Sequence, residues 1–152
     1  MPNRQIVIIT GCSIKKQAKK APAHKLYQGV VFKKVKDLAK LHDLDFMILS
    51  AKYGLIQSTE IIEPYDLVIK NKTDVLKLQE IVIPKLFQIE NDYTLIILIM
   101  GRNYRAVIAP RFGEKYKMIH DYRGIGGLTS RLNKYLNSTL QDLLDDLENC
   151  RI

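Results

Sequence analysis

The sequence Tyr93-Thr94-Leu95-Ile96-Ile97-Leu98-Ile99-Met100 is the most apolar run of the chain, and it decides the fold class. A run of this length is too short to span a membrane, which takes about 20 residues. A short, continuous, isoleucine-rich run is typical of a strand that is buried on both faces, as in the middle of a parallel sheet. We therefore expect residues 93–100 to form a central parallel strand.

Working outward, three further short apolar runs are predicted to be strands, and they occupy residues 5–10, 46–49 and 116–119. Between and after them, apolar residues at helical spacing predict helices over residues 23–42, 73–89, 104–109 and 128–148, with Pro84 expected to kink or shorten the second. Strands that alternate with helices predict a parallel sheet with helices on both faces. The expected fold is α/β, a three-layer α/β/α sandwich with a mainly parallel four-stranded sheet.

The composition is that of an ordinary globular protein, with 152 residues, 47% of them hydrophobic and 26% charged, so we expect a single domain over residues 1–152. No apolar run is long enough for a membrane helix and residues 1–4 do not resemble a signal peptide, which favours a cytoplasmic protein. The two cysteines lie near opposite ends and His24, His42 and His120 are scattered. We expect no disulfide, no metal and no cofactor.

The net charge of +8 is concentrated in one part of the chain. Residues 1–40 contain ten basic residues and a single acid, Asp37. Concentrated positive charge favours a phosphate-bearing partner, either nucleic acid or a nucleotide. The alternative is a solvated helix face followed by a basic surface loop.

In open α/β sheets, ligands bind beyond the carboxyl ends of the strands, which here selects the loops 11–22, 50–70 and 101–105. The first loop has a hydroxyl and four lysines suited to holding a phosphate, Ser13, Lys15, Lys16, Lys19 and Lys20, and Cys12 is a further ligand-binding candidate. It lacks the Walker spacing and the dinucleotide fingerprint, which disfavours ATP- or NAD-dependent chemistry. The alternative is a plain surface loop without a ligand. Cys12 could be a nucleophile, or only a small packed residue.

The second loop, residues 50–70, is longer than the roughly 2–6 residues usual for such connections, which marks it as a candidate site. We predict that Glu63, Asp66 and Lys52 are catalytic, with a carboxylate acting as a base or stabilising a cationic transition state. Ligand-binding residues are expected at Ser50, Tyr53, Gly54 and Tyr65. The rings of the two tyrosines could stack on a base. Alternatively, Glu63 only pairs with Lys52 and the tyrosines only cover the end of the sheet.

Two glycine-containing segments are further candidates. In the third loop, Gly101 could let a ligand approach the backbone, with Tyr104 beside it. Before the last predicted helix, Gly126, Gly127 and Thr129 suggest a helix start that favours an anion. A flexible hinge over residues 124–127 is the alternative.

The stretch Leu49-Ser50-Ala51-Lys52-Tyr53-Gly54-Leu55-Ile56, followed by Ile62-Glu63-Pro64-Tyr65-Asp66-Leu67, resembles the signature of the YaaA peroxide-stress protein family. It looks closer to small uncharacterised relatives of that family. These also have a Cys-Ser loop, as at residues 12–16, and an Ala-Pro-Ala segment, as at residues 21–27. A Gly-x-x-Tyr element at residues 101–104 extends the likeness over residues 6–105. Here Pro-Tyr-Asp stands where YaaA proteins have Pro-Tyr-Arg.

This resemblance implies DNA binding and protection from oxidative damage, since YaaA proteins are linked to both and some relatives resemble glycosylases of oxidised pyrimidines. The expected fold is also similar in architecture to uracil-DNA glycosylases. We therefore expect a nucleic-acid- or nucleobase-acting protein, with an N-glycosidic hydrolase as the sharpest form. The alternatives are a non-catalytic DNA- or RNA-binding or stress-response module, and an enzyme that binds a nucleotide or small metabolite. Leucines of the last helix could form a homo-oligomer interface or pack in the core.

Overall fold

The computed structural model describes residues 5–11, 19–26, 29–65 and 67–148. In this part of the chain, five strands form one sheet in the order β4-β3-β1-β6-β7. Four of them are parallel: β1 (Ile6–Gly11), β3 (Asp45–Ser50), β6 (Leu95–Ile99) and β7 (Tyr116–Met118). These four strands were predicted from the sequence, and the prediction is confirmed.

Strand β1 lies at the centre of the sheet, with Ile8 opposite Phe46 of β3 and Ile97 of β6. Alternate side chains of β1 enter two separate cores. Ile8 belongs to one cluster, whereas Val7 and Ile9 belong to the other. The continuous apolar run thus has a physical reason, because both faces of the strand are buried.

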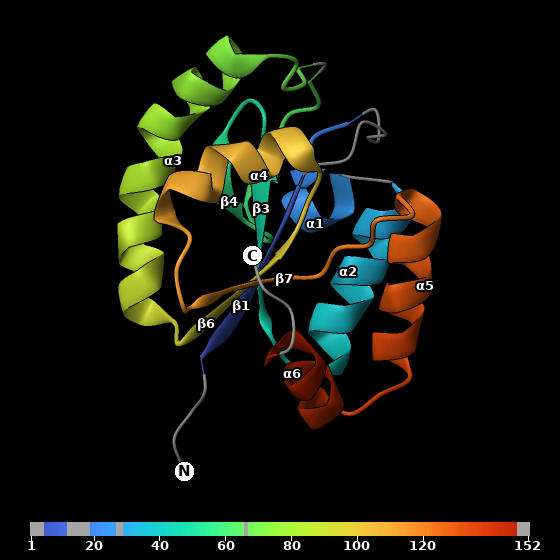
Figure 1. Cartoon of the computed structure of the whole chain (residues 1–152). Helices are drawn as coiled ribbons and strands as arrows, with labels where there is room; N and C mark the ends of the chain where they lie inside the picture. The colour runs from blue at the N-terminus through green and yellow to red at the C-terminus, as the bar shows by residue number, and fades with distance from the viewer. Residues whose placement is uncertain (1–4, 12–18, 27–28, 66, 149–152) are drawn as a thin grey trace.

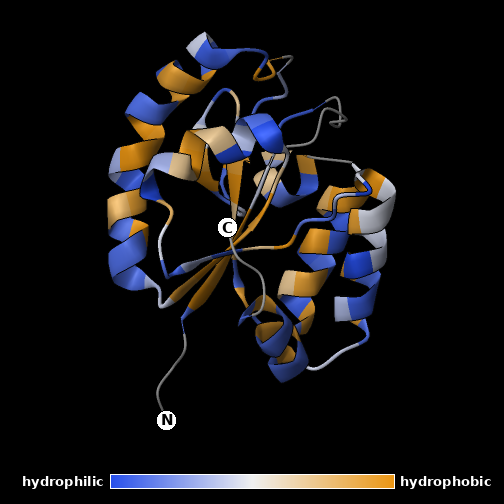
Figure 2. Ribbon diagram, viewed as in Figure 1, coloured by the Kyte–Doolittle hydropathy of each residue, from blue (hydrophilic) through white to orange (hydrophobic). Residues whose placement is uncertain are grey.

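Helices pack against both faces of the sheet (Figure 1). The side of Val7 is covered by α3 (Lys72–Asp92) and α4 (Arg102–Ile108), which a 3-10 turn, η1 (Ala109–Arg111), follows. The side of Ile8 is covered by α1 (Ala23–Leu26), α2 (Val30–Leu41), α5 (Ile125–Leu136) and α6 (Leu140–Glu148). Apolar residues of these helices face the sheet (Figure 2), as their helical spacing requires.

The sheet differs from the predicted four strands by a fifth one, β4 (Gly54–Gln57), which is antiparallel to β3. A second, two-stranded sheet pairs β2 (Ala21–Pro22) with β5 (Ile61–Ile62). Residues 50–70 are therefore not a long loop, as we expected, but a hairpin followed by a short strand. Strands of four and two residues are too short to show a periodic pattern in the sequence.

Two of the predicted helices are divided, and one is longer than expected. The region 23–42 contains α1 and α2, and the region 128–148 contains α5 and α6. Helix α6 begins after Thr139, whose hydroxyl accepts a hydrogen bond from the Asp142 amide while the Asp142 carboxylate accepts from the Thr139 amide. Helix α3 continues through the exposed Pro84 to Asp92, so the proline does not shorten it.

The leucines of the last two helices pack within the chain. Leu132, Leu143, Leu144 and Leu147 are buried in the core beside α2 and β1. Core packing therefore accounts for them. Among the described residues, no helix combines the length and the apolar character that crossing a membrane requires.

Candidate functional site

The turn between β3 and β4 is held by Ser50, at the carboxyl end of β3. Its side chain is completely buried, and its hydroxyl oxygen accepts hydrogen bonds from the amides of Lys52 (3.1 Å) and Tyr53 (3.0 Å). The same oxygen shares a hydrogen bond of 2.6 Å with the Tyr65 hydroxyl. Ser50, predicted to bind a ligand, instead uses its hydroxyl to fix residues 51–53.

The two tyrosines predicted to stack on a base contact each other. Their rings are perpendicular, with centroids 5.5 Å apart, and the Tyr53 hydroxyl donates to the Glu63 carbonyl at 3.4 Å. Tyr65 is only 9% exposed and belongs to the core on the α2 side of the sheet. Tyr65 therefore clamps the turn, while the partly exposed Tyr53 retains an accessible surface.

Gly54 begins β4 with a φ of +74°, a conformation that side chains rarely adopt. A β-carbon here would also lie 3.2 Å from the Ile81 Cδ1 atom of α3. The glycine of the Lys52-Tyr53-Gly54 stretch thus permits the turn and the close approach of α3.

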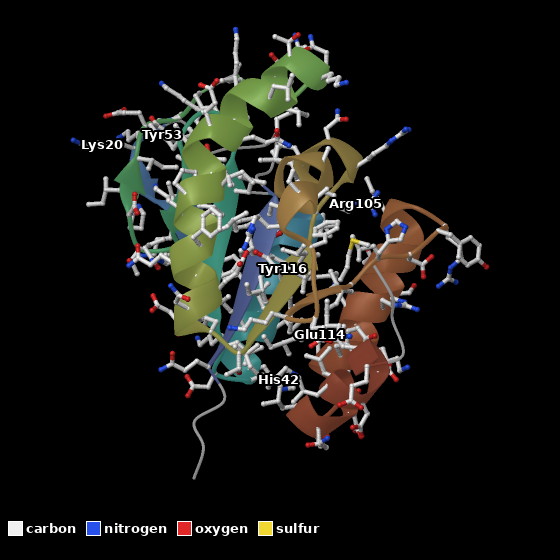
Figure 3. The ribbon with its side chains drawn as sticks, turned by 60° about the vertical axis from the view of Figure 1, so that its left-hand side comes forward. Lys20, His42, Tyr53, Arg105, Glu114 and Tyr116 are labelled. Atoms are coloured by element: carbon white, nitrogen blue, oxygen red, sulfur yellow. The ribbon has the colours of Figure 1, made fainter. Side chains whose placement is uncertain are left out.

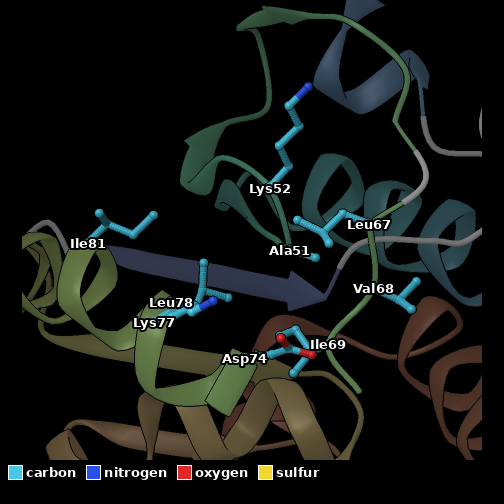
Figure 4. Close-up of a pocket in the computed structure, with 9 residues that line it drawn as sticks. All are labelled: Ala51, Lys52, Leu67, Val68, Ile69, Asp74, Lys77, Leu78 and Ile81. Atoms are coloured by element: carbon cyan, nitrogen blue, oxygen red, sulfur yellow. The ribbon is translucent and has the colours of Figure 1, made fainter. Parts of the chain in front are cut away.

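A pocket of about 290 Å³ opens beside this turn, between residues 51–52, residues 67–69 and the first turns of α3 (Figure 4). Its lining is mostly apolar, with Ala51, Leu67, Val68, Ile69, Leu78 and Ile81. Three charged residues complete it, namely Lys52, Asp74 and Lys77. An apolar surface with a few charged groups is the usual composition of a small-ligand site.

The carboxylate of this pocket is engaged, whereas its two lysines form no salt bridge with any described residue. Asp74 accepts a hydrogen bond from the Lys70 amide at 3.0 Å, and its own amide donates to the Asn71 side chain that caps α3. The amines of Lys52 and Lys77 are exposed. The pocket therefore offers positive charge to a ligand.

Further basic side chains come from other segments of the chain. In the view of Figure 3, Lys20 and Tyr53 project on one side of the molecule and Arg105 on the other. Lys70, Lys72 and Arg102 are exposed and, like Lys20 and Arg105, form no salt bridge with another described residue. Lys19 is described and exposed, whereas Cys12, Ser13, Lys15 and Lys16 lie outside the described residues.

The predicted catalytic carboxylates are only partly described. Glu63 is exposed and, within the described residues, forms no salt bridge with Lys52, so the structural alternative of a Glu63–Lys52 pair is not realised. Instead, the Lys52 amine lies 5.2 Å from the centroid of the Tyr53 ring. Asp66 lies outside the described residues.

Helix α4 connects to the pocket through Asn103, a residue that sequence reasoning missed. Its side-chain amide donates to the Ile69 carbonyl at 3.0 Å and so fixes one wall of the pocket. Gly101 is exposed, and a β-carbon on it would meet no atom within 4 Å. Tyr104 instead packs beside Gly11, where a β-carbon would lie 3.6 Å from the Tyr104 ring.

Asp121, also missed, lies four residues before the start of α5. This buried carboxylate accepts from the Arg123 amide (2.9 Å) and from its guanidinium at Nε (2.9 Å) and Nη2 (3.0 Å). These bonds lower the pKa of Asp121 to about 2. The sequence signal was an aspartate two residues before an arginine and followed by three glycines within six residues.

The Asp121 carboxylate presses against Gly127, where a β-carbon would lie 2.2 Å from Oδ1. Thr129 donates its hydroxyl to the Ile125 carbonyl at 2.7 Å. The protein's own carboxylate thus takes the place at Gly127 where we expected an external anion, and Thr129 has an internal partner. Gly126 is exposed, and a β-carbon added to it would meet no atom within 4 Å.

The strongest pKa shifts lie near the amino ends of the parallel strands, opposite the carboxyl ends, and have structural causes. Burial, together with a 2.5 Å hydrogen bond to Asp45, raises the pKa of Tyr93 to about 12. Burial and a 2.6 Å hydrogen bond to Glu90 also raise the pKa of Tyr116 (Figure 3), and Arg111 pairs with the same carboxylate. These contacts join the end of α3 to β3 and β7, and none of their residues lines the pocket.

The described residues contain no group of three or more histidine, cysteine, aspartate or glutamate side chains that could hold a metal ion. His42 lies 3.1 Å from the Tyr135 carbonyl and His120 lies 3.3 Å from Arg105, so each is tied to a neighbouring helix.

Comparison with known proteins finds a match over residues 6–135 with a family that is described as a family of unknown function (DUF6884). The match covers all five strands of the main sheet and most of α5. No curated protein matches the chain.

Proposed function

The chain belongs to the DUF6884 family, whose function is unknown, and we propose from its site that it binds nucleic acid or a nucleotide at the carboxyl edge of the parallel strands. One observation carries this proposal. Lys52 and Lys77 flank an apolar pocket, and neither is neutralised by a described carboxylate. An apolar surface accepts a base, and the ammonium groups beside it attract its phosphate.

The surroundings of the pocket support a ligand with several phosphates. Lys20, Lys70, Lys72, Arg102 and Arg105 come from four different segments. Lys70 and Lys72 lie at the start of α3, which lines the pocket, and Arg102 and Arg105 belong to α4, which follows the carboxyl end of β6. Basic groups spread over several segments suit a chain of phosphates better than a single one, because each neutralised phosphate releases counterions. A polynucleotide is therefore our preferred ligand, and a free nucleotide is the smaller alternative.

The fold also supports this location. Two separate cores on opposite faces of the sheet agree with the proposed α/β/α layering, in which ligands bind beyond the carboxyl ends of the strands. The likeness of residues 49–67 to the YaaA signature points to the same edge. Much of that signature, however, builds the turn that holds Lys52 at the pocket.

The first test replaces both pocket lysines, Lys52→Gln with Lys77→Gln. We expect the affinity for a labelled single-stranded oligonucleotide to fall about tenfold at low salt, and the slope of log affinity against log salt to fall by about 2, one for each lost phosphate contact. Fluorescence anisotropy over a salt series measures both. The matched control is Lys33→Gln with Lys40→Gln, two exposed lysines of α2, which should keep the wild-type affinity.

The wild-type protein should bind DNA or RNA in this assay, and unlabelled nucleotides should compete if the ligand is small. A wild-type protein that binds neither polynucleotide nor nucleotide at low salt would overturn the proposal. Equal losses of affinity in the pocket and control variants would mean that binding depends on the net charge of the protein and not on the pocket.

The sharper form of the proposal is hydrolysis of an N-glycosidic bond. In this reaction water adds to the sugar carbon, the bond to the base breaks, and the base leaves with a proton. Glu63 would orient the water and accept its proton, or stabilise the cationic sugar, with Asp66 as the second candidate. The side chain of Glu63 is exposed, and its carbonyl accepts a hydrogen bond from the Tyr53 hydroxyl. Both observations support access of the Glu63 carboxylate to a bound strand.

We expect Glu63→Gln to abolish base release from duplexes that carry uracil or oxidised pyrimidines, while oligonucleotide affinity stays within about twofold, since a neutral amide cannot accept the proton. Chromatography of released base and anisotropy measure the two effects separately. Glu60→Gln, on a neighbouring exposed carboxylate, is the control. Binding without any base release by the wild-type protein would favour a non-catalytic binding module.

A further inference from the structure

The segment between β7 and α5 exposes a large aromatic side chain. Tyr122 is 91% exposed, and Ile125, three residues later, is 74% exposed. Both follow the carboxyl end of β7, so they lie at the same edge of the sheet as the pocket. Tyrosine usually packs at least one face of its ring against the protein, and this one does not.

This exposure occurs on a segment that is firmly anchored on both sides of the tyrosine. Asp121 is buried and holds Arg123 through three hydrogen bonds. The Gly124 amide donates to the Asp121 carbonyl at 3.2 Å, and Gly124 adopts a φ of +83°. The backbone of Tyr122 is therefore held between two fixed residues, and little backbone entropy remains to be lost when a ligand binds.

Three arginines, Arg105, Arg123 and Arg131, outnumber the one carboxylate, Asp121, among the contacts of the residues on either side of Tyr122. Arg105 lies 3.3 Å from His120, and the side chain of Arg123 is 57% exposed. The carboxylate of the segment, Asp121, is buried and neutralised by Arg123 and Arg131. An exposed aromatic ring on a segment that carries or contacts several arginines suits a nucleic acid, which presents flat bases and phosphates together.

We propose that Tyr122 stacks on an unpaired base, so that the protein recognises single-stranded nucleic acid or a base removed from its stack. This inference rests on the proposed function and names the form of the nucleic acid. A continuous duplex covers both faces of each internal base, whereas a single strand leaves them accessible. The anchored segment would hold one base while the pocket and its lysines hold another part of the strand.

The first experiment uses the absence of tryptophan from the sequence. Tyr122→Trp introduces a single tryptophan, and we expect its emission to be quenched when an unlabelled single-stranded oligonucleotide is added, because a stacked base contacts the indole directly. Phe87→Trp is the control. Phe87 is 50% exposed and lies in the C-terminal half of α3, whereas the pocket is lined by the first turns of this helix. Equal quenching in both variants, or none at position 122 while the strand is bound, would overturn the inference.

The second experiment separates stacking from simple apolar contact. By anisotropy, Tyr122→Ala and Tyr122→Leu should each weaken single-strand binding by about tenfold, the order of one lost base–aromatic stack, while Tyr122→Phe stays near wild type. The salt dependence should not change, because no charge is removed, and duplex affinity should be unaffected. If Tyr122→Leu binds like wild type, the surface accepts apolar groups in general and a protein partner becomes the better explanation.

The two proposals fail in different ways. If the wild-type protein binds no nucleic acid, the proposed function is wrong. If it binds and the Lys52 and Lys77 variants lose affinity while every Tyr122 variant binds normally, the proposed function stands and the stacking role of Tyr122 is wrong.

Discussion

Replacing Gly127 with alanine is expected to lower the free energy of unfolding by about 2–3 kcal/mol, the cost of forcing an extra carbon into a packed position. The added β-carbon would lie 2.2 Å from Asp121 Oδ1, 2.5 Å from its Cγ and 2.8 Å from the Arg123 β-carbon. Such distances are far inside van der Waals contact, so one of the partners has to move.

Neither partner can move without losing bonds. The Asp121 carboxylate is fixed by the Arg123 amide and guanidinium, and Arg131 lies 3.7 Å from its other oxygen. Displacing it would break charge-assisted hydrogen bonds around a buried group, which are the strong ones in proteins. Moving α5 instead would disturb Leu132 and Tyr135, which are buried in the core.

The preceding residue provides the control. Gly126 occupies the same first turn of α5, but a β-carbon there would meet nothing within 4 Å. Alanine is the better helix former, so Gly126→Ala should leave stability unchanged or raise it by up to about 1 kcal/mol. Urea unfolding followed by circular dichroism measures both variants. Similar stability of the two would mean that Asp121 does not press on Gly127 as the structure indicates.

The sequence was sufficient to predict the strands that are buried on both faces. Burial of β1 and β6 on two sides requires a continuous apolar run, such as residues 95–99, and that pattern is visible without a structure. The edge strand β4 has only four residues, with a positive-φ glycine at its start, and its pairing with β3 depends on a turn held by a distant tyrosine. Local periodicity carries no signal of such a contact.

The pocket that we take as the candidate site lies at the end of the sheet where the sequence led us to expect one. The rule for open sheets placed it at the carboxyl edge, and Lys52 does lie at the pocket there. Ser50 and Tyr65 were predicted to bind a ligand, whereas in the structure they bind each other. The sequence alone does not distinguish these two roles, because the residue types are the same in both. Asn103 and Asp121 were missed because their partners, Ile69 and Gly127, are revealed only by folding.

The Ser50–Tyr65 contact leads to a prediction that links stability to binding. Ser50→Ala is expected to lower the free energy of unfolding by about 2 kcal/mol, because it leaves buried or half-buried polar groups without their partner. The amides of Lys52 and Tyr53 lose their acceptor, and the Tyr65 hydroxyl loses its 2.6 Å hydrogen bond. Tyr65→Phe removes only the hydroxyl and should cost about 1 kcal/mol.

The double variant tests whether the two residues act together. Because both single changes remove the same hydrogen bond, Ser50→Ala combined with Tyr65→Phe should be little less stable than Ser50→Ala alone, with a coupling energy of about 1 kcal/mol. Urea unfolding of the four proteins gives this value. Strictly additive effects would show that the serine and the tyrosine stabilise the turn independently.

The same variants connect the turn to the proposed ligand. Ser50→Ala retains Lys52 but frees the backbone that positions it, so single-strand affinity should fall severalfold at a temperature where the variant is fully folded. Tyr65→Phe keeps both amide bonds to Ser50 and should bind nearly as wild type. If Ser50→Ala binds normally although Lys52→Gln with Lys77→Gln does not, the pocket needs the charge of Lys52 but not its fixed position. The turn would then serve the sheet alone.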